Sequence, residues 1–201
     1  MERIKIIKAV QTRLNELTSK NSIDIIPNAL IESLLDSVAL NFLMSAPVFI
    51  LPKVHATPSV VGKSDGTGYF LVPSDYLRLV SFRLDDWIYS VNDLLIDGTI
   101  QAKMQHFKYT RGTVNRPVGV LSFDGDGAKR IEYYTALNAN PTVDEFVYIK
   151  FVKPELLPDN LIELFCWMVV SEVLQVQEYV ELSKAAYDRF VTLVNQYNNA
   201  T

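Results

Sequence analysis

YFLVPSDYLRLVSFRLDDW, residues 69–87, is the stretch that decides the fold. Pro73 fixes φ and lacks an N–H, and the next two residues can hydrogen-bond to nearby backbone, so we expect a short turn there. The apolar run that follows is rich in strand-forming residues. Adjacent Leu79 and Val80 point to opposite faces of a strand, so both faces should contact protein. The stretch therefore predicts an inner segment of a domain, with a helical wall on at least one side.

The composition is that of an ordinary globular protein. At 201 residues, with 49% apolar and 21% charged residues, the chain fits one domain, or one domain with an insertion, and global disorder is excluded. The net charge of −4 and the lack of a Lys or Arg run argue against a protein that binds duplex DNA by neutralising phosphates. The one cysteine, Cys166, lies in an apolar run, which excludes an intrachain disulfide and predicts a buried thiol, most simply in a reducing compartment.

Neither a signal peptide nor a membrane span is expected. The first residues, MERIKIIKAVQTRLNEL, are charged throughout and lack the apolar core of a signal peptide. The most apolar window, residues 161–176, is interrupted by four polar residues and is too short to span a bilayer, so it predicts a buried helix.

Periodic apolar residues predict two helices at each end of the chain. The first covers residues 2–18 with a single narrow stripe, and the second, near 28–45, has a wider apolar surface. After Pro158, a central helix with Asp159 as its N-cap carries apolar residues on most of its circumference. A last helix covers about 182–197.

Residues 51–154 have a different texture, with short segments and frequent turn signals. Candidate strands lie at 69–72, 79–84, 87–91, 117–123, 129–135 and 145–152. The clearest hairpin joins 118–123 to 130–134 through a DGDG turn, whereas residues 99–109 should form a short helix or an irregular arm. The sequence thus predicts an α+β fold. Residues 1–50 and 155–198 form a helical bundle body and residues 51–154 a β-rich insertion, in one structural unit overall.

Residues that could carry chemistry are few. His55 and His106 lie in different loops without a carboxylate or thiol at ligand spacing, so we expect no metal site. The DGDG segment lacks the distal Glu of a calcium loop, and SDGTG at 64–68 lacks the Lys of a phosphate loop, so both should be turns. The pairs Asp85-Asp86 and Asp144-Glu145 should face opposite ways on strands. We expect neither catalysis nor a cofactor.

Aromatic residues crowd two candidate strands: Tyr133, Tyr134, Phe146, Tyr148 and Phe151. On a basic surface such residues could stack on bases. Their neighbours include Glu132, Asp144 and Glu145, so core packing or a protein–protein interface is favoured.

Three stretches resemble the head–tail connector proteins of tailed bacteriophages, also called adaptor or tail-accessory proteins. Residues 71–80, LVPSDYLRLV, with Trp87 shortly after, look like the family's Leu-Pro-Asp-Asp-Phe-Leu-Arg-Leu pattern. Residues 109–118, YTRGTVNRPV, are similar to the family's pattern at the start of a strand. In that pattern a small residue is followed by any two residues, then by Arg or Lys, and then by Pro-Val. Residues 157–163, LPDNLIE, followed by Cys166-Trp167, look like the opening of its penultimate helix.

The resemblance implies a virion structural protein, a ring subunit between the portal and the tail in the portal's twelvefold symmetry. Its implied partners are further copies of itself, the portal protein and other tail or ring proteins. DNA would pass through the ring's channel without sequence-specific binding. An acidic subunit suits such a channel, because attraction to DNA would come from Lys and Arg clusters. A helical body with a separate β insertion supplies the two different faces that a closed ring needs.

We expect the first and last helices to contact neighbouring subunits or the portal, because their apolar stripes are narrow. The candidate interface residues are Ile4, Ile7, Val10, Phe190, Leu193 and Tyr197. The alternative is an α+β protein-interaction or ligand-binding domain without catalytic activity, which uses the aromatic strands as its surface.

Overall fold

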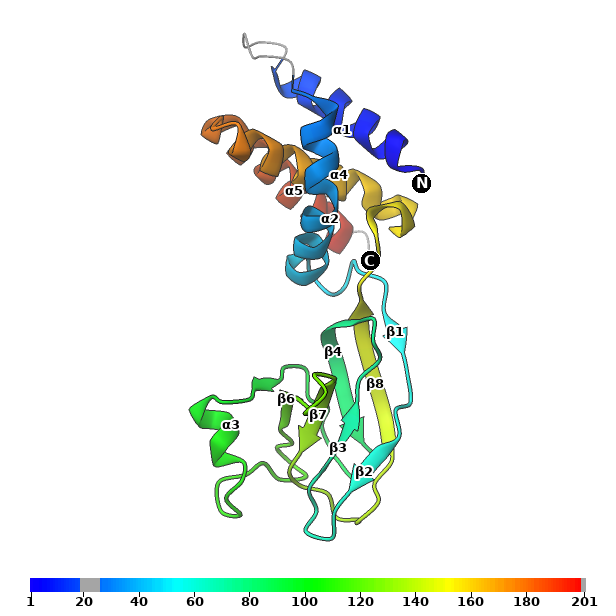
Figure 1. Ribbon diagram of the computed structural model, residues 1–201, viewed down its shortest axis with the longest axis vertical. Coiled ribbons are helices and arrows are strands. Elements are labelled where there is room, and N and C mark those ends of the chain that lie inside the picture. Colours follow the sequence, from blue (N-terminus) through cyan, green and yellow to red (C-terminus); the bar gives the residue numbers. More distant parts are fainter. Residues whose placement is uncertain (19–25, 200–201) are drawn as a thin grey trace. The chain divides into compact units, whose positions relative to one another are not determined.

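The structure, a computed structural model, describes residues 1–18 and 26–199 (Figure 1). Helices and two β-sheets make up this part of the chain, which confirms the α+β class. The chain divides into two compact units. We name Met1–Pro52 with Phe151–Thr201 the helical unit, and Lys53–Lys150 the β-rich unit. The boundaries thus lie at 52/53 and 150/151, where the sequence-based division has 50/51 and 154/155.

The helical unit is built around one buried helix. Its α-helices are α1 (Arg3–Thr18), α2 (Asn28–Ser45), α4 (Asp159–Val176) and α5 (Val180–Asn199), and the 3-10 helix η1 is Pro154–Leu156. Helix α4 packs on α1, α2 and α5. It buries eleven of its residues, as expected for a helix that is apolar on most sides. The predicted central helix is confirmed, and the last helix begins two residues earlier than expected, at Val180.

The expected N-cap of α4 is wrong by one residue. Pro158 occupies the cap position, and Asp159 is the first residue of the helix. Proline fixes its own φ, and the backbone of Pro158 (φ −56°, ψ 143°) already has the non-helical conformation that a cap requires. The Asp159 carboxylate still lies in the first turn, where it complements the helix dipole.

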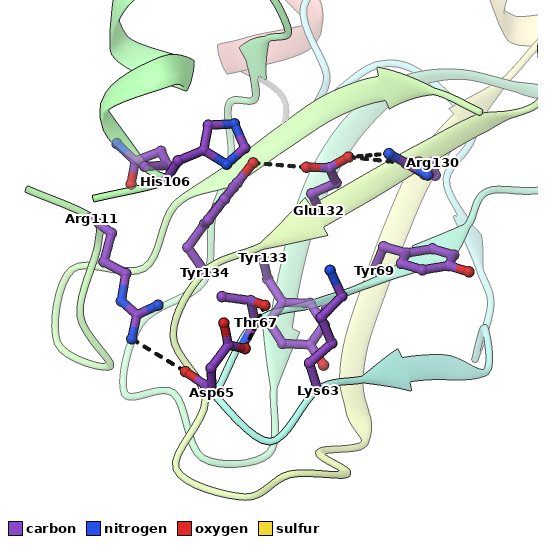
Figure 2. A pocket seen from close by; sticks show the side chains of 12 residues that line it. Lys63, Asp65, Thr67, Tyr69, His106, Arg111, Arg130, Glu132, Tyr133 and Tyr134 are labelled. Atoms are coloured by element: carbon purple, nitrogen blue, oxygen red, sulfur yellow. Dashed lines mark hydrogen bonds and ion pairs between the residues drawn. The ribbon is translucent and has the colours of Figure 1, made fainter. Parts of the chain in front are cut away.

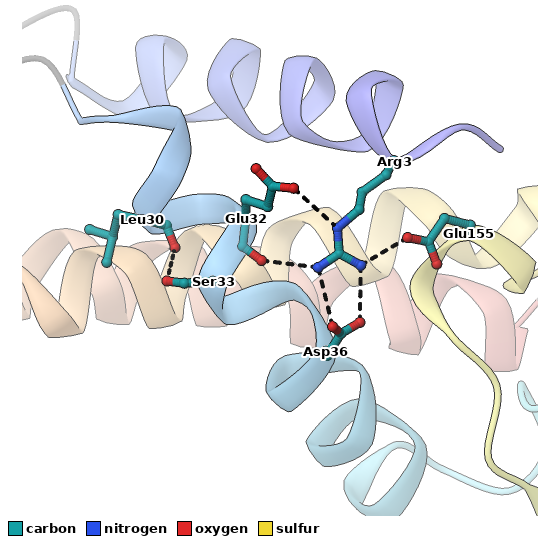
Figure 3. A network of polar contacts seen from close by, with 6 residues as sticks. All are labelled: Arg3, Leu30, Glu32, Ser33, Asp36 and Glu155. Atoms are coloured by element: carbon teal, nitrogen blue, oxygen red, sulfur yellow. Dashed lines mark hydrogen bonds and ion pairs between the residues drawn. The ribbon is translucent and has the colours of Figure 1, made fainter.

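Polar contacts tie the helices together, and two sets of them illustrate how. The guanidinium of Arg3 in α1 donates to Asp36 in α2 (3.1 and 3.2 Å) and to Glu155 in η1 (2.8 Å), as Figure 3 shows. Between α4 and α5, each hydroxyl of Ser171 and Ser183 donates to the backbone carbonyl of the other residue (3.0 and 2.9 Å). The second set is buried, so it satisfies polar groups that water cannot reach.

The β-rich unit consists of two sheets. Sheet A has the order β1-β8-β4, with β1 Val54–His55, β8 Val143–Lys150 and β4 Tyr76–Leu84, and it is antiparallel throughout. Sheet B has the order β2-β3-β7-β6-β5, with β2 Val60–Gly62, β3 Gly68–Leu71, β7 Lys129–Tyr133, β6 Gly119–Phe123 and β5 Leu95–Ile96. Only the β5–β6 pair is parallel. The short helix α3 is Ile100–Met104.

An aromatic core joins the two sheets. Phe82 in β4 lies 4.9 Å from Phe70 in β3, between ring centroids, and 4.9 Å from Trp87. Phe146 in β8 meets Phe70 edge-on at 5.3 Å. The buried side chains of β4 therefore pack on a second sheet and its loops, whereas the sequence suggested a helical wall on at least one side. The turn expected at residues 73–75 is present, since the Tyr76 N–H donates to the Pro73 carbonyl.

Strand positions are partly as expected. The β6–β7 hairpin is confirmed, and its turn is held by the Asp124 carboxylate, which accepts from two backbone N–H groups. The expected strand at 87–91 is wrong, because Val91 alone forms a bridge, to Phe82, while Trp87 turns inward to fill the core. Strands β1, β2 and β5 were not predicted, since two or three residues are too few to show alternation.

Candidate functional site

A short arm, residues 99–116, lies against the outer face of sheet B, the face turned away from the aromatic core. Ala102 in α3 is buried in a small apolar cluster with Tyr134. Beyond the helix, the buried side chain of Gln105 accepts a hydrogen bond from the Gly112 N–H (2.8 Å), which closes the loop. The arm is thus an ordered element held to the sheet by a few side chains, and its α3 segment is helical.

The arm exposes a row of large apolar side chains. Ile100 is 74% exposed, Phe107 66% and Tyr109 97%, and Met104 is exposed as well. Ile100 and Met104 are four residues apart, so they share one face of α3, and Phe107 follows three residues after the helix ends. Monomeric proteins seldom expose contiguous apolar groups of this size unless a partner covers them.

The arm is also basic. Lys103, Lys108, Arg111 and Arg116 lie on it, and no Asp or Glu occurs from Gly98 to Phe123. Lys103, Lys108 and Arg116 are exposed, and none of the ion pairs among the described residues includes them. Sequence reasoning missed this surface because it looked for consecutive cations. The signal that could have found it is a long segment without acidic residues.

A polar hollow of about 360 Å³ lies beside the arm (Figure 2). Its lining comes from the β2–β3 turn, the arm and β7, and includes Lys63, Asp65, Thr67, Tyr69, His106, Arg111, Arg130, Glu132, Tyr133 and Tyr134. Arg111 donates to the Asp65 backbone carbonyl (3.2 Å), which links the arm to the turn. The His106 ring meets Tyr134 edge-on, with centroids 5.3 Å apart.

Glu132 is the best-connected charge in this lining. It accepts hydrogen bonds from Arg130 (2.6 Å), Ser122 (2.8 Å) and Tyr134 (2.7 Å). Burial raises the pKa of Glu132, but the hydrogen bonds from these three side chains outweigh it, so the net pKa lies below its ordinary value. The carboxylate therefore stays ionised near neutral pH. Its partner Arg130 also stacks over Tyr69, with the guanidinium carbon 5.1 Å from the ring centroid. These contacts are typical of a carboxylate that stabilises the fold, and not of a general acid or base.

The members of each carboxylate pair contact different partners. The expected position on a strand is wrong for Asp85 and Asp86, which lie in the turn after β4, and right for Asp144 and Glu145 on β8. Asp85 accepts from the backbone N–H and the hydroxyl of Thr142 (3.2 and 3.0 Å), and Asp86 accepts from the Asn138 N–H (3.4 Å). Glu145 accepts from Ser90 (3.1 Å), while Asp144 pairs with an arginine on β4. Each carboxylate thus fixes local structure, and the two members of a pair do not share a site.

The remaining candidates are placed as follows. Among the described residues, no three His, Cys, Asp or Glu side chains lie close enough together to hold a metal ion. The SDGTG segment is a turn with Gly66 at φ +79°, closed by Asp65 accepting from Thr67. Cys166 is buried, as predicted, and burial raises the pKa of its thiol to about 11.

The aromatic residues on β7 and β8 are core residues. Tyr133, Tyr134, Phe146 and Tyr148 are buried, whereas Phe151 is exposed. Of the six candidate interface residues, Ile7, Val10 and Phe190 are buried within the chain, Leu193 and Tyr197 are half-buried, and Ile4 is 60% exposed. In this conformation Ile4 offers the largest apolar contact of the six.

No protein-family model matches the chain, and no curated protein matches it either. In residues 1–18 and 26–199, no helix has both the length and the apolar character that crossing a membrane requires.

Proposed function

We propose that this protein is a non-enzymatic structural protein of a phage virion, a subunit of a head–tail connector ring between the portal and the tail. The observation that carries the proposal is the exposed apolar row on the arm. Side chains such as Ile100 and Phe107, largely open to solvent, are typical of a surface that another protein covers. An assembly subunit needs such a surface.

The resemblance to connector proteins supplies the kind of assembly. Its three stretches lie at structural junctions: the turn between β3 and β4, the passage from the arm into β6, and the entry into α4. On this proposal the ring follows the portal's twelvefold symmetry, contacts portal and tail proteins, and lets DNA pass without sequence-specific binding.

The distribution of charge supports a ring with a repelling channel. The helical unit carries twelve acidic and eight basic residues, a net charge of −4, whereas the β-rich unit carries eleven of each. Acidic surface repels DNA phosphates, so an acidic channel wall would let DNA slide.

The alternative is an α+β domain that binds a ligand or another protein without catalysis. The polar hollow beside the arm is the observation that favours it. The aromatic strands cannot be its surface in this conformation, because Tyr133, Phe146 and Tyr148 are buried.

Assembly on the portal separates the two functions. The purified protein is mixed with the portal protein of the same phage and observed by negative-stain microscopy and by size-exclusion chromatography with light scattering. The proposal expects a ring seated on the portal, with a mass of about twelve subunits. A persistent monomer that does not bind the portal would overturn it.

A further inference from the structure

The tip of the α4–α5 hairpin has the opposite chemistry to the arm. We name residues 172–181 the acidic tip. It carries Glu172, Glu178 and Glu181, and no Lys or Arg occurs from Asp159 to Ser183. Val180 is 67% exposed there, and Val176 is also exposed. Acidic groups thus surround an apolar spot, while the arm has basic groups around an apolar row.

Backbone strain marks the same tip. Glu178 has φ 62°, and it is the one non-glycine residue with positive φ in the described part of the chain. It closes α4, since the next residue, Tyr179, donates to the Leu174 carbonyl (2.9 Å). Glycine is the usual residue at such a position, because a Cβ is sterically disfavoured there. A glutamate at this strained position points to a use for its side chain.

We propose that the arm of one copy docks on the acidic tip of the next copy, so that Lys103 and Lys108 face Glu178 and Glu181. This inference rests on the ring function proposed above. The arm and the tip are different surfaces, so the contact is heterologous and can propagate around a ring. Complementary charge would set the register, and the apolar groups of both surfaces would supply the buried area.

The apolar row argues for protein rather than nucleic acid as the occupant. Phosphates pair with lysines, and bases stack on aromatic rings. Neither would cover the aliphatic side chains of Ile100 and Met104, which are exposed on one face of α3. The valines of the acidic tip are suitable partners for them.

Charge reversal and its rescue test the contact. The variants are K103E/K108E on the arm, E178K/E181K on the tip, and the combination of all four substitutions. We expect each double variant to raise the concentration for half-maximal ring assembly by at least about tenfold, and the combination to restore much of the loss. Circular dichroism checks that each variant folds. K129E, at an exposed lysine on β7 away from the arm, is the control and should assemble normally.

E178G separates the side chain's role from the backbone's. Glycine relieves the positive φ, so the monomer should melt at a higher temperature while assembly weakens. A variant that is more stable and assembles equally well would contradict the use proposed for Glu178.

The outcomes are distinguishable from a failure of the ring function. If the unmodified protein forms no ring, the proposed function fails before any variant is compared. If it forms rings and K103E/K108E assembles unchanged, or if the combined variant shows no rescue, this contact is wrong and the ring function stands. If instead K103E/K108E assembles normally but loses binding to a fluorescent DNA duplex, the arm contacts nucleic acid and the proposal is overturned.

Discussion

The two units bury their apolar residues in different ways. In the β-rich unit, aromatic rings from distant strands meet edge-on, as Phe70, Phe82 and Phe146 do. In the helical unit, α1, α2 and α5 pack on α4 around a mostly aliphatic core, in which Phe42 meets Phe165 and Phe190 edge-on (6.0 and 6.2 Å). Polar contacts such as those of Arg3 and Ser171 join neighbouring elements. An aromatic core concentrates its energy in a few large side chains, whereas a core with fewer rings spreads more of it over aliphatic side chains. Single substitutions should therefore have unequal effects in the two units.

The largest effect should come from Phe82→Ala. Phe82 is fully buried and contacts both Phe70 and Trp87, so its truncation leaves a large cavity and should lower the free energy of unfolding by about 3–5 kcal/mol. Urea unfolding measures this loss of stability, and the fluorescence of the two tryptophans shows in which unit it occurs. Trp87 reports on the β-rich unit and Trp167 on the helical unit, so each is followed in a background where the other is phenylalanine.

The control for this substitution is Phe123→Ala, at an exposed position on β6, which should change stability by no more than about 0.5 kcal/mol. If Phe82→Ala shifts the Trp167 transition as much as the Trp87 transition, the two units do not unfold separately. The difference between their cores would then have no effect on how the two units unfold.

The next largest effect tests how tightly the aromatic core is packed. A Cβ on Gly68 would lie 2.2 Å from the Tyr133 hydroxyl and 2.5 Å from the Val61 carbonyl oxygen, so Gly68→Ala should cost about 1–3 kcal/mol. Gly125→Ala is the matched control, because nothing lies within 4 Å of its added Cβ. Thermal melting of both variants gives the difference.

Tyr133→Phe extends the same experiment. The hydroxyl is buried without a partner among the described residues, and burial raises its pKa to about 12. Its removal should therefore be neutral or stabilising, and it should reduce the cost of Gly68→Ala. Equal costs in both backgrounds would show that the hydroxyl does not limit the space, and that the ring carbon Cζ or the Val61 oxygen, each 2.5 Å from the added Cβ, does.

The contrast between the units also explains what the sequence could reveal. The buried residues of a helix recur every three or four positions, so the stripe through Val10 and the apolar surface of α4 could be predicted from the sequence. The β6–β7 hairpin was readable because its turn residues are specific. The pairing of β1 with β8 joins residues about ninety positions apart, and no local pattern encodes such a contact. The exposed row on the arm was missed for a related reason: apolar residues at helical spacing look the same whether they are covered or not.

In the helical unit, the Ser171–Ser183 pair should contribute less than one core aromatic. Ser171→Ala removes one buried hydrogen bond between α4 and α5 and should cost about 1 kcal/mol, as measured by urea unfolding with Trp167 as the probe. Ser45→Ala removes an exposed bond within α2 and is the control, with an expected change below about 0.5 kcal/mol. Equal costs for the two substitutions would mean that burial does not strengthen this contact.

The smallest effect should come from Arg3, and it should depend on pH. Hydrogen bonds from Arg3 are the main cause that lowers the pKa of both Asp36 and Glu155. A carboxylate with a lowered pKa in the folded state stabilises it above the unfolded pKa, about 4, and loses that contribution as the pH falls through the folded value. Arg3 is 29% exposed and Asp36 62%, so solvent screens the pair. Arg3→Met should therefore cost only about 0.5–1 kcal/mol at pH 7.

The cost of Arg3→Met should shrink as the pH falls below 4 through the lowered folded-state pKa values of Asp36 and Glu155, because each carboxyl that is protonated in both states no longer contributes. Urea unfolding at pH 7, 4 and 2.5, followed through Trp167, measures this dependence. Lys5→Met is the control, because it breaks an exposed pair with Glu2 at 3.4 Å within one helix and should cost less than about 0.5 kcal/mol. A cost of Arg3→Met that is the same at all three pH values would show that the arginine acts through the packing of its aliphatic stem and its bond to the Glu32 carbonyl (3.1 Å). The contacts of Arg3 would then stabilise the helical unit whether or not the two carboxyls are charged, just as the aromatic rings stabilise the β-rich unit.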